Sequence, residues 1–274
     1  ASLCGRPLHH AIENFYDPRG WCTLGRETSI QKVYWDEEGW PRIDGGHGGL
    51  VEVDAPKDAI LTRAPETHAA YDDFMAKELD GEWNTLRVPF SERMGSVGGG
   101  RLKLTGRGSL SNRFDLSFIA RRWRDFVFSA VTKVKFDPYS YQAMAGLANY
   151  YNNEHWSWIF ITRDDSNNRV IEVAECDNKK YTSILKKDAV VIPKGTEWVW
   201  FKTVIDHLDY WYEYSFDGEV WHRIPVILDA KVLSDDYVMS HYGGFFTGAF
   251  VGLAAVDYSG YGSEAEFGFF EYRV

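Results

Sequence analysis

Carboxylate side chains are the residues of this sequence whose type could support acid–base chemistry. Hydrolysis by paired carboxyl groups needs one group to act as the acid and another as the base or nucleophile, with both flanking the bond that breaks. Five acidic residues lie in plausible settings: Glu27, Asp72, Asp73, Glu154 and Asp257. No two of them stand out as an acid–base couple, so the sequence assigns no catalytic residue.

Structural roles account for most of these positions. Glu27 follows Arg26 and is suited to an ion pair with it. Asp72 and Asp73 open a predicted strand, and Asp257 begins a turn in the sequence VDYSG. Short acidic side chains commonly cap such turns by accepting backbone hydrogen bonds.

The three cysteines, Cys4, Cys22 and Cys176, do not have the spacing of a metal site. Cys4 and Cys22, together with His9 and His10, repeat no known zinc-ligand pattern. Scattered thiols in a chain of 274 residues fit a reducing compartment better than a disulfide scaffold. We therefore expect a cytoplasmic location.

Composition indicates an all-β protein that handles a neutral ligand. Aromatic residues make up 16% of the chain and there are 25 glycines, a combination that favours strands and tight turns. The formal net charge of −10 disfavours nucleic acid or an anionic membrane surface as a partner. No apolar run approaches the roughly 18 residues of a membrane span. We expect no nucleic-acid and no membrane partner.

The elements that would position these residues fall into three regions. Residues 1–54 contain short apolar stretches around a Gly-rich loop at 45–49, and so few strands would leave their sheet edges unpaired. This suggests that a segment is missing upstream. Residues 55–70 have two prolines and no apolar period, which predicts a linker. Residues 71–274 carry the remaining strands.

Residues 71–274 are predicted to form a sandwich of two antiparallel sheets. Side chains alternate within 126–136, where Phe128 and Ala130 face one way and Val127 and Ser129 the other. The dipeptide at 217–218, Asp-Gly, predicts a hairpin turn, and one helical turn is expected at 230–236. The predicted strands are 101–104, 114–121, 126–136, 143–150, 156–162, 170–174, 189–192, 197–205, 210–215, 220–224, 245–256 and 265–272.

The segment 241–255, HYGGFFTGAFVGLAA, is predicted to be a turn followed by a buried strand. Gly243 and Gly244 allow a sharp turn, and an apolar run of strand length follows. Two explanations remain for Phe245 and Phe246. They pack in the core, or they stack on a ligand at the turn, where rigid scaffolds commonly carry function.

Several motifs in the chain resemble glycoside hydrolase family 43 β-xylosidases. LSDDY at 233–237, FFTGAFVGL at 245–253 and VDYSGYGSEAEFGFFEY at 256–272 are similar to the C-terminal sandwich of that family. LGRETSIQKVYW at 24–35, with GRPL before it and GWP after it, resembles the closing blade of the family's five-bladed propeller. Further matches are ARRW, AGLANYYN and YSFDGEVW. The resemblance covers nearly the whole chain and implies a concanavalin-like two-sheet sandwich preceded by a partial propeller blade.

The resemblance also implies a function. Family members hydrolyse xylo-oligosaccharides from the non-reducing end, with a general-base Asp, a general-acid Glu and a third Asp on blades that precede GRPL. This chain has none of those blades, so we expect it to be the C-terminal part of a β-xylosidase, or of an α-L-arabinofuranosidase, that is inactive alone. The expected partners are the substrate and the upstream propeller half. Family members often form tetramers, which allows a homo-oligomer, and no cofactor is required.

Two substrate contacts are carried over from the family. Arg26 of LGRET matches an arginine at the bottom of the sugar pocket, where a guanidinium can donate several hydrogen bonds to hydroxyls. Phe246, or Phe245 with a shift of one residue, matches a phenylalanine that closes the pocket mouth. The alternative for Arg26 is a surface ion pair.

A structural calcium ion is a further expectation, because sandwiches of the concanavalin type often hold one through carboxylates and carbonyls. Asp72 or Asp73 together with Asp257 could supply the ligands, and turn capping is the alternative. For the chain as a whole, the alternatives to part of an enzyme are a stand-alone carbohydrate-binding module and a structural or oligomerisation sandwich.

Overall fold

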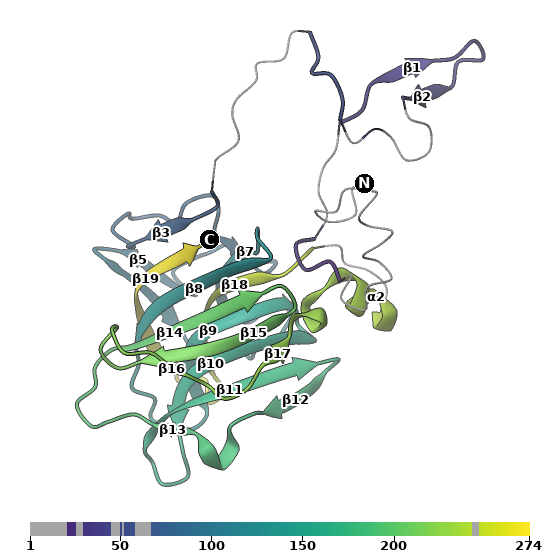
Figure 1. Cartoon of the computed structure of the whole chain (residues 1–274). Helices are drawn as coiled ribbons and strands as arrows, with labels where there is room; N and C mark the ends of the chain where they lie inside the picture. The colour runs from purple at the N-terminus through teal and green to yellow at the C-terminus, as the bar shows by residue number, and fades with distance from the viewer. Residues whose placement is uncertain (1–20, 26–29, 45–49, 51, 58–66, 243–246) are drawn as a thin grey trace.

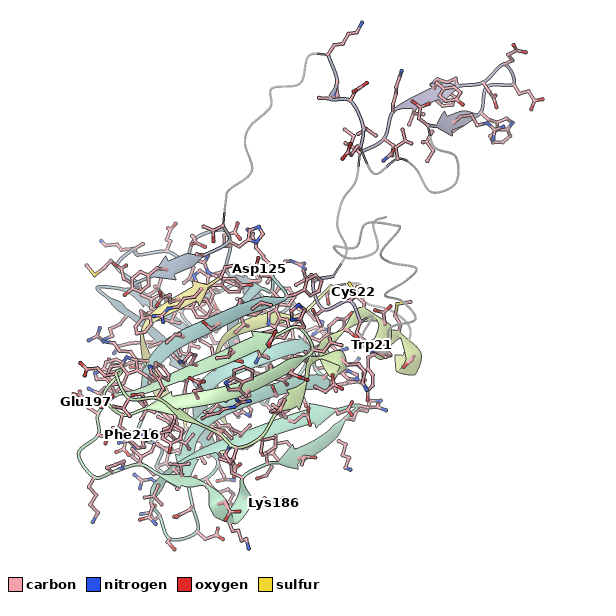
Figure 2. All side chains as sticks on the ribbon, viewed as in Figure 1. Trp21, Cys22, Asp125, Lys186, Glu197 and Phe216 are labelled. Atoms are coloured by element: carbon pink, nitrogen blue, oxygen red, sulfur yellow. The ribbon has the colours of Figure 1, made fainter. Side chains whose placement is uncertain are left out.

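A computed structural model describes residues 21–25, 30–44, 50, 52–57, 67–242 and 247–274 (Figure 1). Most of these residues form two large antiparallel sheets stacked face to face, and side chains fill the space between the sheets (Figure 2). The predicted all-β, two-sheet sandwich is therefore confirmed. None of the described helices is long and apolar enough to cross a membrane.

The first sheet has eight strands in the order β12-β11-β10-β9-β18-β7-β4, with β13 also paired to β11. The pair β9 and β18 lies at the centre of this sheet, so a strand from near the C-terminus lies beside a strand from the middle of the sequence. The strands are β4 (Asn84–Thr85), β7 (Ser117–Arg122), β9 (Ala143–Asn152), β10 (His155–Arg163), β11 (Arg169–Asp177), β12 (Lys180–Ser183), β13 (Val190–Val191) and β18 (Phe250–Asp257).

The second sheet has nine strands in the order β16-β15-β14-β8-β19-β6-β5, with β17 paired to β15 and β3 to β19. Here too a C-terminal strand, β19, lies in the middle. The strands are β3 (Ala70–Asp72), β5 (Gly95–Gly98), β6 (Arg101–Thr105), β8 (Val127–Lys135), β14 (Val199–Asp206), β15 (Asp209–Ser215), β16 (His222–Arg223), β17 (Leu228–Asp229) and β19 (Glu264–Arg273).

The main core lies between the two sheets and follows the alternation expected of strands. In β8, Phe128, Ala130 and Val134 are buried while Ser129 and Lys133 are partly exposed, as predicted. The first sheet is also apolar on its other face, where a second cluster of buried side chains includes large aromatic residues of β10. Because both faces of its central strands are buried, β9, β10 and β18 consist largely of apolar residues.

A separate hairpin precedes the sandwich. It consists of β1 (Val33–Trp35) and β2 (Pro41–Ile43), which pair with each other in a two-stranded sheet. Asp36 caps its turn by accepting hydrogen bonds from the backbone N–H groups of Glu38 and Trp40. The side chains of Trp35 and Trp40 are 70% and 62% exposed. Exposed large apolar side chains that lie together often mark a surface that contacts another part of a protein.

The helical segments differ from the prediction. They are η2 (Lys186–Asp188), η3 (Ala230–Leu233) and α2 (Asp235–Tyr242). The single turn expected at 230–236 thus corresponds to η3 and only the start of α2. Ser234 begins α2 because its hydroxyl accepts a hydrogen bond from the backbone N–H of Tyr237.

The predicted strand 245–256 begins later than expected. β18 starts at Phe250, and Gly248 has a φ of +70°, a left-handed conformation that interrupts an extended strand. Residues 243–246 lie outside the described part of the chain. The Asp-Gly hairpin is confirmed by the pairing of Tyr214 with His222, across a loop longer than two residues.

Candidate functional site

Two segments from opposite ends of the chain pack backbone to backbone at one edge of the sandwich. The N–H of Ala249 donates a hydrogen bond to the carbonyl of Thr23 (2.7 Å). Gly25 and Gly248 face each other so closely that a Cβ atom on Gly248 would lie 2.5 Å from the nitrogen of Gly25. Both glycines have positive φ angles, +80° and +70°. Residues 21–25 and 247–249 are called the paired segments below.

Helix α2 anchors the paired segments through its first two residues. Asp235 is 5% exposed, and its Oδ1 accepts hydrogen bonds from the Tyr151 hydroxyl (2.6 Å) and the Gly248 N–H (3.2 Å). The backbone N–H of Asp235 donates to the carbonyl of Cys22 (2.9 Å). Asp236 completes the contact, because its Oδ2 accepts from the N–H of Cys22 (2.7 Å). Burial and the bond to Asp235 raise the pKa of the Tyr151 phenol well above its ordinary value.

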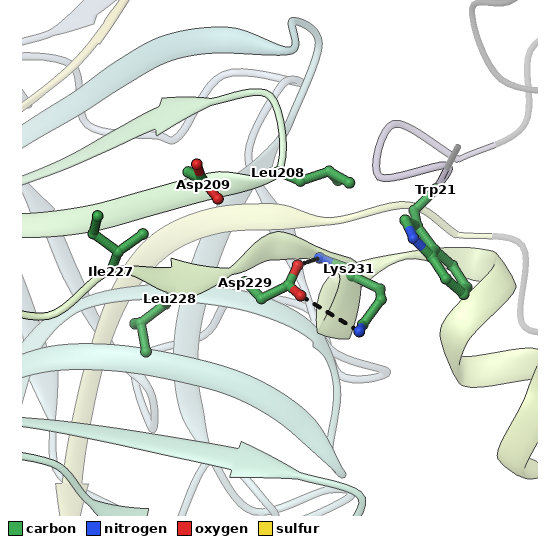
Figure 3. A pocket seen from close by; sticks show the side chains of 7 residues that line it. All are labelled: Trp21, Leu208, Asp209, Ile227, Leu228, Asp229 and Lys231. Atoms are coloured by element: carbon green, nitrogen blue, oxygen red, sulfur yellow. Dashed lines mark hydrogen bonds and ion pairs between the residues drawn. The ribbon is translucent and has the colours of Figure 1, made fainter. Parts of the chain in front are cut away.

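An aromatic and cationic pocket lies beside the paired segments. Trp21 meets the ring of Tyr237 edge-on at 6.4 Å between centroids, and the Lys231 ammonium lies 5.7 Å from the Trp21 ring centre. Figures 2 and 3 show Trp21 next to α2, and Figure 3 shows Lys231 bonded to Asp229. The pocket has a volume of about 260 Å³. It is lined by Trp21, Leu208, Asp209, Ile227, Leu228, Asp229 and Lys231.

Tyr237 connects this pocket to the first sheet. Its hydroxyl donates to the carboxylate of Asp177, with both oxygens within 3.1 Å. Burial, followed by this hydrogen bond, raises the pKa of Tyr237 to about 12. The phenol therefore stays protonated at neutral pH and acts as a fixed donor.

A second pocket, of about 300 Å³, lies where the chain enters the sandwich and contains three arginines, Arg121, Arg122 and Arg124. Arg121 pairs with Asp80 (2.6 Å), and Arg124 pairs with Glu82. The Arg122 guanidinium donates to the carbonyl of Thr247 and lies over the ring of Phe250 at 4.8 Å. Arg122 therefore contacts the second of the paired segments from the sandwich side.

The sequence-predicted substrate contacts Arg26, Phe245 and Phe246 lie outside the described residues, as does Glu27. Their roles stay predictions. What the structure does describe is the residue before Arg26 and the residues after Phe246. These described neighbours, Gly25 and Thr247, belong to the paired segments.

Asp72 and Asp73 hold local hydrogen bonds. Asp72 accepts from the backbone N–H of Phe74 (2.8 Å) and from the indole of Trp83 (2.7 Å), while Asp73 accepts from the N–H of Met75 (3.0 Å). Each is therefore a turn cap. Glu154, another carboxylate that the sequence singled out, lies 3.6 Å from the ammonium of Lys179.

Asp257 is a buried cap in a different part of the fold. Its carboxylate accepts hydrogen bonds from the Tyr139 hydroxyl (2.9 Å) and from the backbone N–H groups of Ser259 (2.9 Å) and Ser263 (2.8 Å). Burial opposes ionisation, yet the hydrogen bonds from Ser259, Ser263 and Tyr139 prevail and lower the pKa of Asp257 to about 2.

The structure does not bring the expected calcium ligands together. Asp257 bonds to Ser263, just before β19, whereas Asp72 pairs with Phe270 near the end of that strand. Seven residues of extended chain span about 23 Å. Over the described ranges, no group of three or more His, Cys, Asp or Glu residues could hold a metal ion. A calcium ion therefore remains an expectation from the fold type, without support from these residues.

Sequence reasoning missed Tyr151, Asp235 and Asp236. Both aspartates belong to the LSDDY motif, and two acidic residues after a serine are a signal for the start of a helix. Asp236 contacts Cys22, which lies 214 positions away in the sequence, and no local pattern reveals such a contact.

The fold defines a class, the two-sheet antiparallel sandwich of the concanavalin type. The model of the β-xylosidase C-terminal concanavalin A-like domain matches residues 71–273. The chain belongs to this family, which is part of glycoside hydrolase family 43, and the resemblance seen in the motifs is confirmed.

Relatives extend the similarity to the rest of the chain. A β-xylosidase from Bacillus subtilis (strain 168) is 42% identical over 275 aligned residues, covering 100% of this chain and 51% of that protein. A xylosidase/arabinosidase from Humicola insolens is 30% identical and covers 92% of this chain and 47% of its own length. The crystal structure of a xylan β-1,4-xylosidase from Bacillus halodurans C-125 superposes with a TM-score of 0.82 at 33% identity, covering 93% of this chain and 48% of that one. The chain spans about half the length of the curated relatives it matches.

Proposed function

We propose that this chain is the C-terminal part of an exo-acting glycosidase that removes xylose, or alternatively arabinose, from the non-reducing end of xylo-oligosaccharides. In this proposal Arg26 and Phe246 reach one sugar pocket, whose catalytic carboxylates belong to the half of the enzyme that precedes this chain. The observation that carries the proposal is the contact between Gly25 and Gly248. Arg26 directly follows the first glycine, and Phe246 lies two positions before the second.

The contact between Gly25 and Gly248 matters for the proposal because the chain continues from these glycines to the two proposed sugar contacts. Consecutive Cα atoms are about 3.8 Å apart, so residues next to two touching glycines start from neighbouring points of the backbone. A guanidinium there can donate to two sugar hydroxyls at once and never loses its charge. An aromatic ring across from it offers an apolar wall to the sugar face and excludes water from the reacting bond. No cofactor is needed for this division of labour.

The exposed hairpin supports the second part of the proposal, namely that another half of the enzyme precedes this chain. Trp35 and Trp40 would be buried if β1 and β2 were two strands of a propeller blade completed by that half. We accordingly propose the division into a blade fragment at 1–54, a linker at 55–70 and the sandwich at 71–274. Relatives named β-xylosidase, xylosidase/arabinosidase and α-L-arabinofuranosidase match 91–100% of this chain and are about twice as long, which supports a further half in the intact enzyme.

The test uses an intact enzyme in which this chain is joined to the half that its relatives possess. Arg26→Ala should lower kcat/KM for an aryl β-xyloside about 100-fold, because sugar hydroxyls lose charged donors. Phe246→Ala should reduce the preference for short over long xylo-oligosaccharides. Arg93→Ala is the matched control, because that side chain is 79% exposed and 3.6 Å from Asp115. Kinetics of Arg26→Ala that equal those of the control would overturn the assignment.

A further inference from the structure

The LSDDY motif at 233–237 contributes more than the start of a helix. Ser234 caps α2, and Tyr237 bonds to Asp177, which accounts for two members of the motif. The two aspartates are directed at the paired segments instead. Of the two, only Asp235 contacts both segments and the sandwich among the described residues.

We infer that Asp235 is a positioning residue for the sugar site, an inference that rests on the proposed function. Its carboxylate holds the Gly248 N–H of one segment and the Tyr151 hydroxyl of β9, and its own N–H holds the Cys22 carbonyl of the other segment. One side chain thus fixes both segments relative to the rigid first sheet. Asp235 itself need not touch the substrate.

The burial of Asp235 makes this role sensitive to substitution. Asp235 is only 5% exposed, so when its carboxylate is removed no water replaces it as the hydrogen-bond acceptor for its partners. A shift of residues 247–249 would let the unpaired Gly248 N–H and Tyr151 hydroxyl find other hydrogen-bond acceptors. In the proposed function the groups that these segments carry bind the sugar, whereas proton transfer belongs to the preceding half, so their displacement weakens binding more than it slows the chemical step. The site would therefore lose substrate affinity while the sandwich stays folded.

Asp236 provides a matched comparison. It is adjacent, carries the same charge and lies in the same turn of α2, but its described contact is only with the N–H of Cys22. Any general effect of removing a carboxylate from the start of this helix applies equally to both residues. An effect that is larger in the Asp235 variant than in the Asp236 variant therefore reports the contacts that Asp235 makes with both paired segments.

The experiment measures aryl β-xyloside hydrolysis by the intact enzyme and its variants. Asp235→Ala should raise KM about 10-fold and lower kcat less than about threefold. Asp235→Asn keeps the Oδ1 acceptor, so its KM should stay within about threefold of the wild-type value. Asp236→Ala removes a contact with only one of the paired segments, so it should raise KM clearly less than Asp235→Ala does. A purely structural role would lower kcat through loss of folded enzyme and leave KM unchanged.

Tyr151→Phe provides a second route if Asp235→Ala folds poorly. It keeps the buried ring and removes only the donor to Asp235, and should raise KM about threefold. The double variant should be no worse than Asp235→Ala alone, because both changes break the same connection. In the same proteins, amide exchange at 21–25 and 247–249 should be faster in Asp235→Ala than in Asp236→Ala.

The outcomes separate two failures. Absence of hydrolysis by the wild-type intact enzyme overturns the proposed function and this inference together. Active wild-type enzyme with unchanged KM in both Asp235→Ala and Tyr151→Phe overturns this inference alone. An equal rise of KM in Asp236→Ala also overturns it.

Discussion

Among single residues, Asp257 shows how a buried carboxylate in this fold is used for structure. Both of its oxygens accept hydrogen bonds from the turn that connects β18 to β19, and the residue is 4% exposed. These hydrogen bonds favour the ionised form over the protonated one. Stability of the sandwich should therefore depend on the charge of Asp257.

The sign of this dependence follows from the lowered pKa, about 2 against an ordinary 3.8. A group whose pKa is lower in the folded state stabilises it fully above pH 4, and this contribution is lost as the pH falls toward 2. The shift corresponds to about 2 kcal/mol of unfolding free energy. Asp257→Asn should lack this pH-dependent contribution to the unfolding free energy.

Urea unfolding of the wild-type chain and of Asp257→Asn from pH 5 to pH 2 measures the difference. The gap between the two proteins should shrink by about 2 kcal/mol across that range. Asp73→Asn, which removes the charge of an exposed turn cap and keeps its Oδ1 acceptor, is the control and should track the wild type. A gap that stays constant with pH would contradict the assigned role.

Gly248 supplies a second test at the residue scale. A methyl group there would meet the backbone of Leu24 and Gly25 at 2.5 Å, and the φ of +70° adds strain. Gly260 has a similar φ of +80°, and a methyl group added there would meet nothing within 4 Å. Gly260→Ala therefore isolates the strain, about 1–2 kcal/mol.

Gly248→Ala should therefore destabilise the chain more than Gly260→Ala and should release residues 21–25 from the sandwich. Thermal unfolding compares the stabilities, and hydrogen exchange reports whether residues 21–25 are protected. Equal protection of those residues in both variants would mean that the paired segments do not depend on this contact.

At the scale of elements, the strands with regular alternation were predictable, whereas the helical region was predicted only as a single turn at 230–236. The spacing of buried residues in β8 and the hairpin between β15 and β16 follow local rules of side-chain direction and turn chemistry. α2 has no strong helical period of its own, and its position depends on contacts with Cys22 and Gly248. The sequence instead favoured an early start for β18.

The same distinction applies to the site. A family resemblance could point to Arg26 and Phe246, because each lies in a long motif. The anchoring by Asp235 could not be predicted, since it joins segments that are distant in sequence through one buried side chain. Short acidic residues beside a serine indicate a helix start and nothing about what else they bind.

The hairpin of β1 and β2 gives a prediction for an element. If it belongs to a blade shared with the proposed preceding half, the amides of 33–35 and 41–43 should exchange more slowly in the intact enzyme than in this chain alone. β8, in the sandwich core, is the internal control and should show the same protection in both. Equal exchange of the hairpin amides in both proteins would argue against a shared blade.

On the scale of the whole molecule, the chain combines a two-sheet sandwich with a hairpin whose large apolar side chains are exposed. The sandwich has its own core between two sheets and should fold without the half that the proposed function places before this chain. Catalysis is divided under the proposed function: proton transfer belongs to the proposed preceding half, and this chain supplies a cationic floor and an aromatic wall. Neither part should suffice alone.

Hydrolysis of an aryl β-xyloside by three samples tests this division most directly: this chain, the proposed preceding half, and the two joined or mixed. We predict turnover only when both parts are present. Retention of this chain on xylan without any turnover on mixing would instead favour a carbohydrate-binding module. Turnover by this chain alone, or undiminished turnover by the other half without it, would contradict a divided active site.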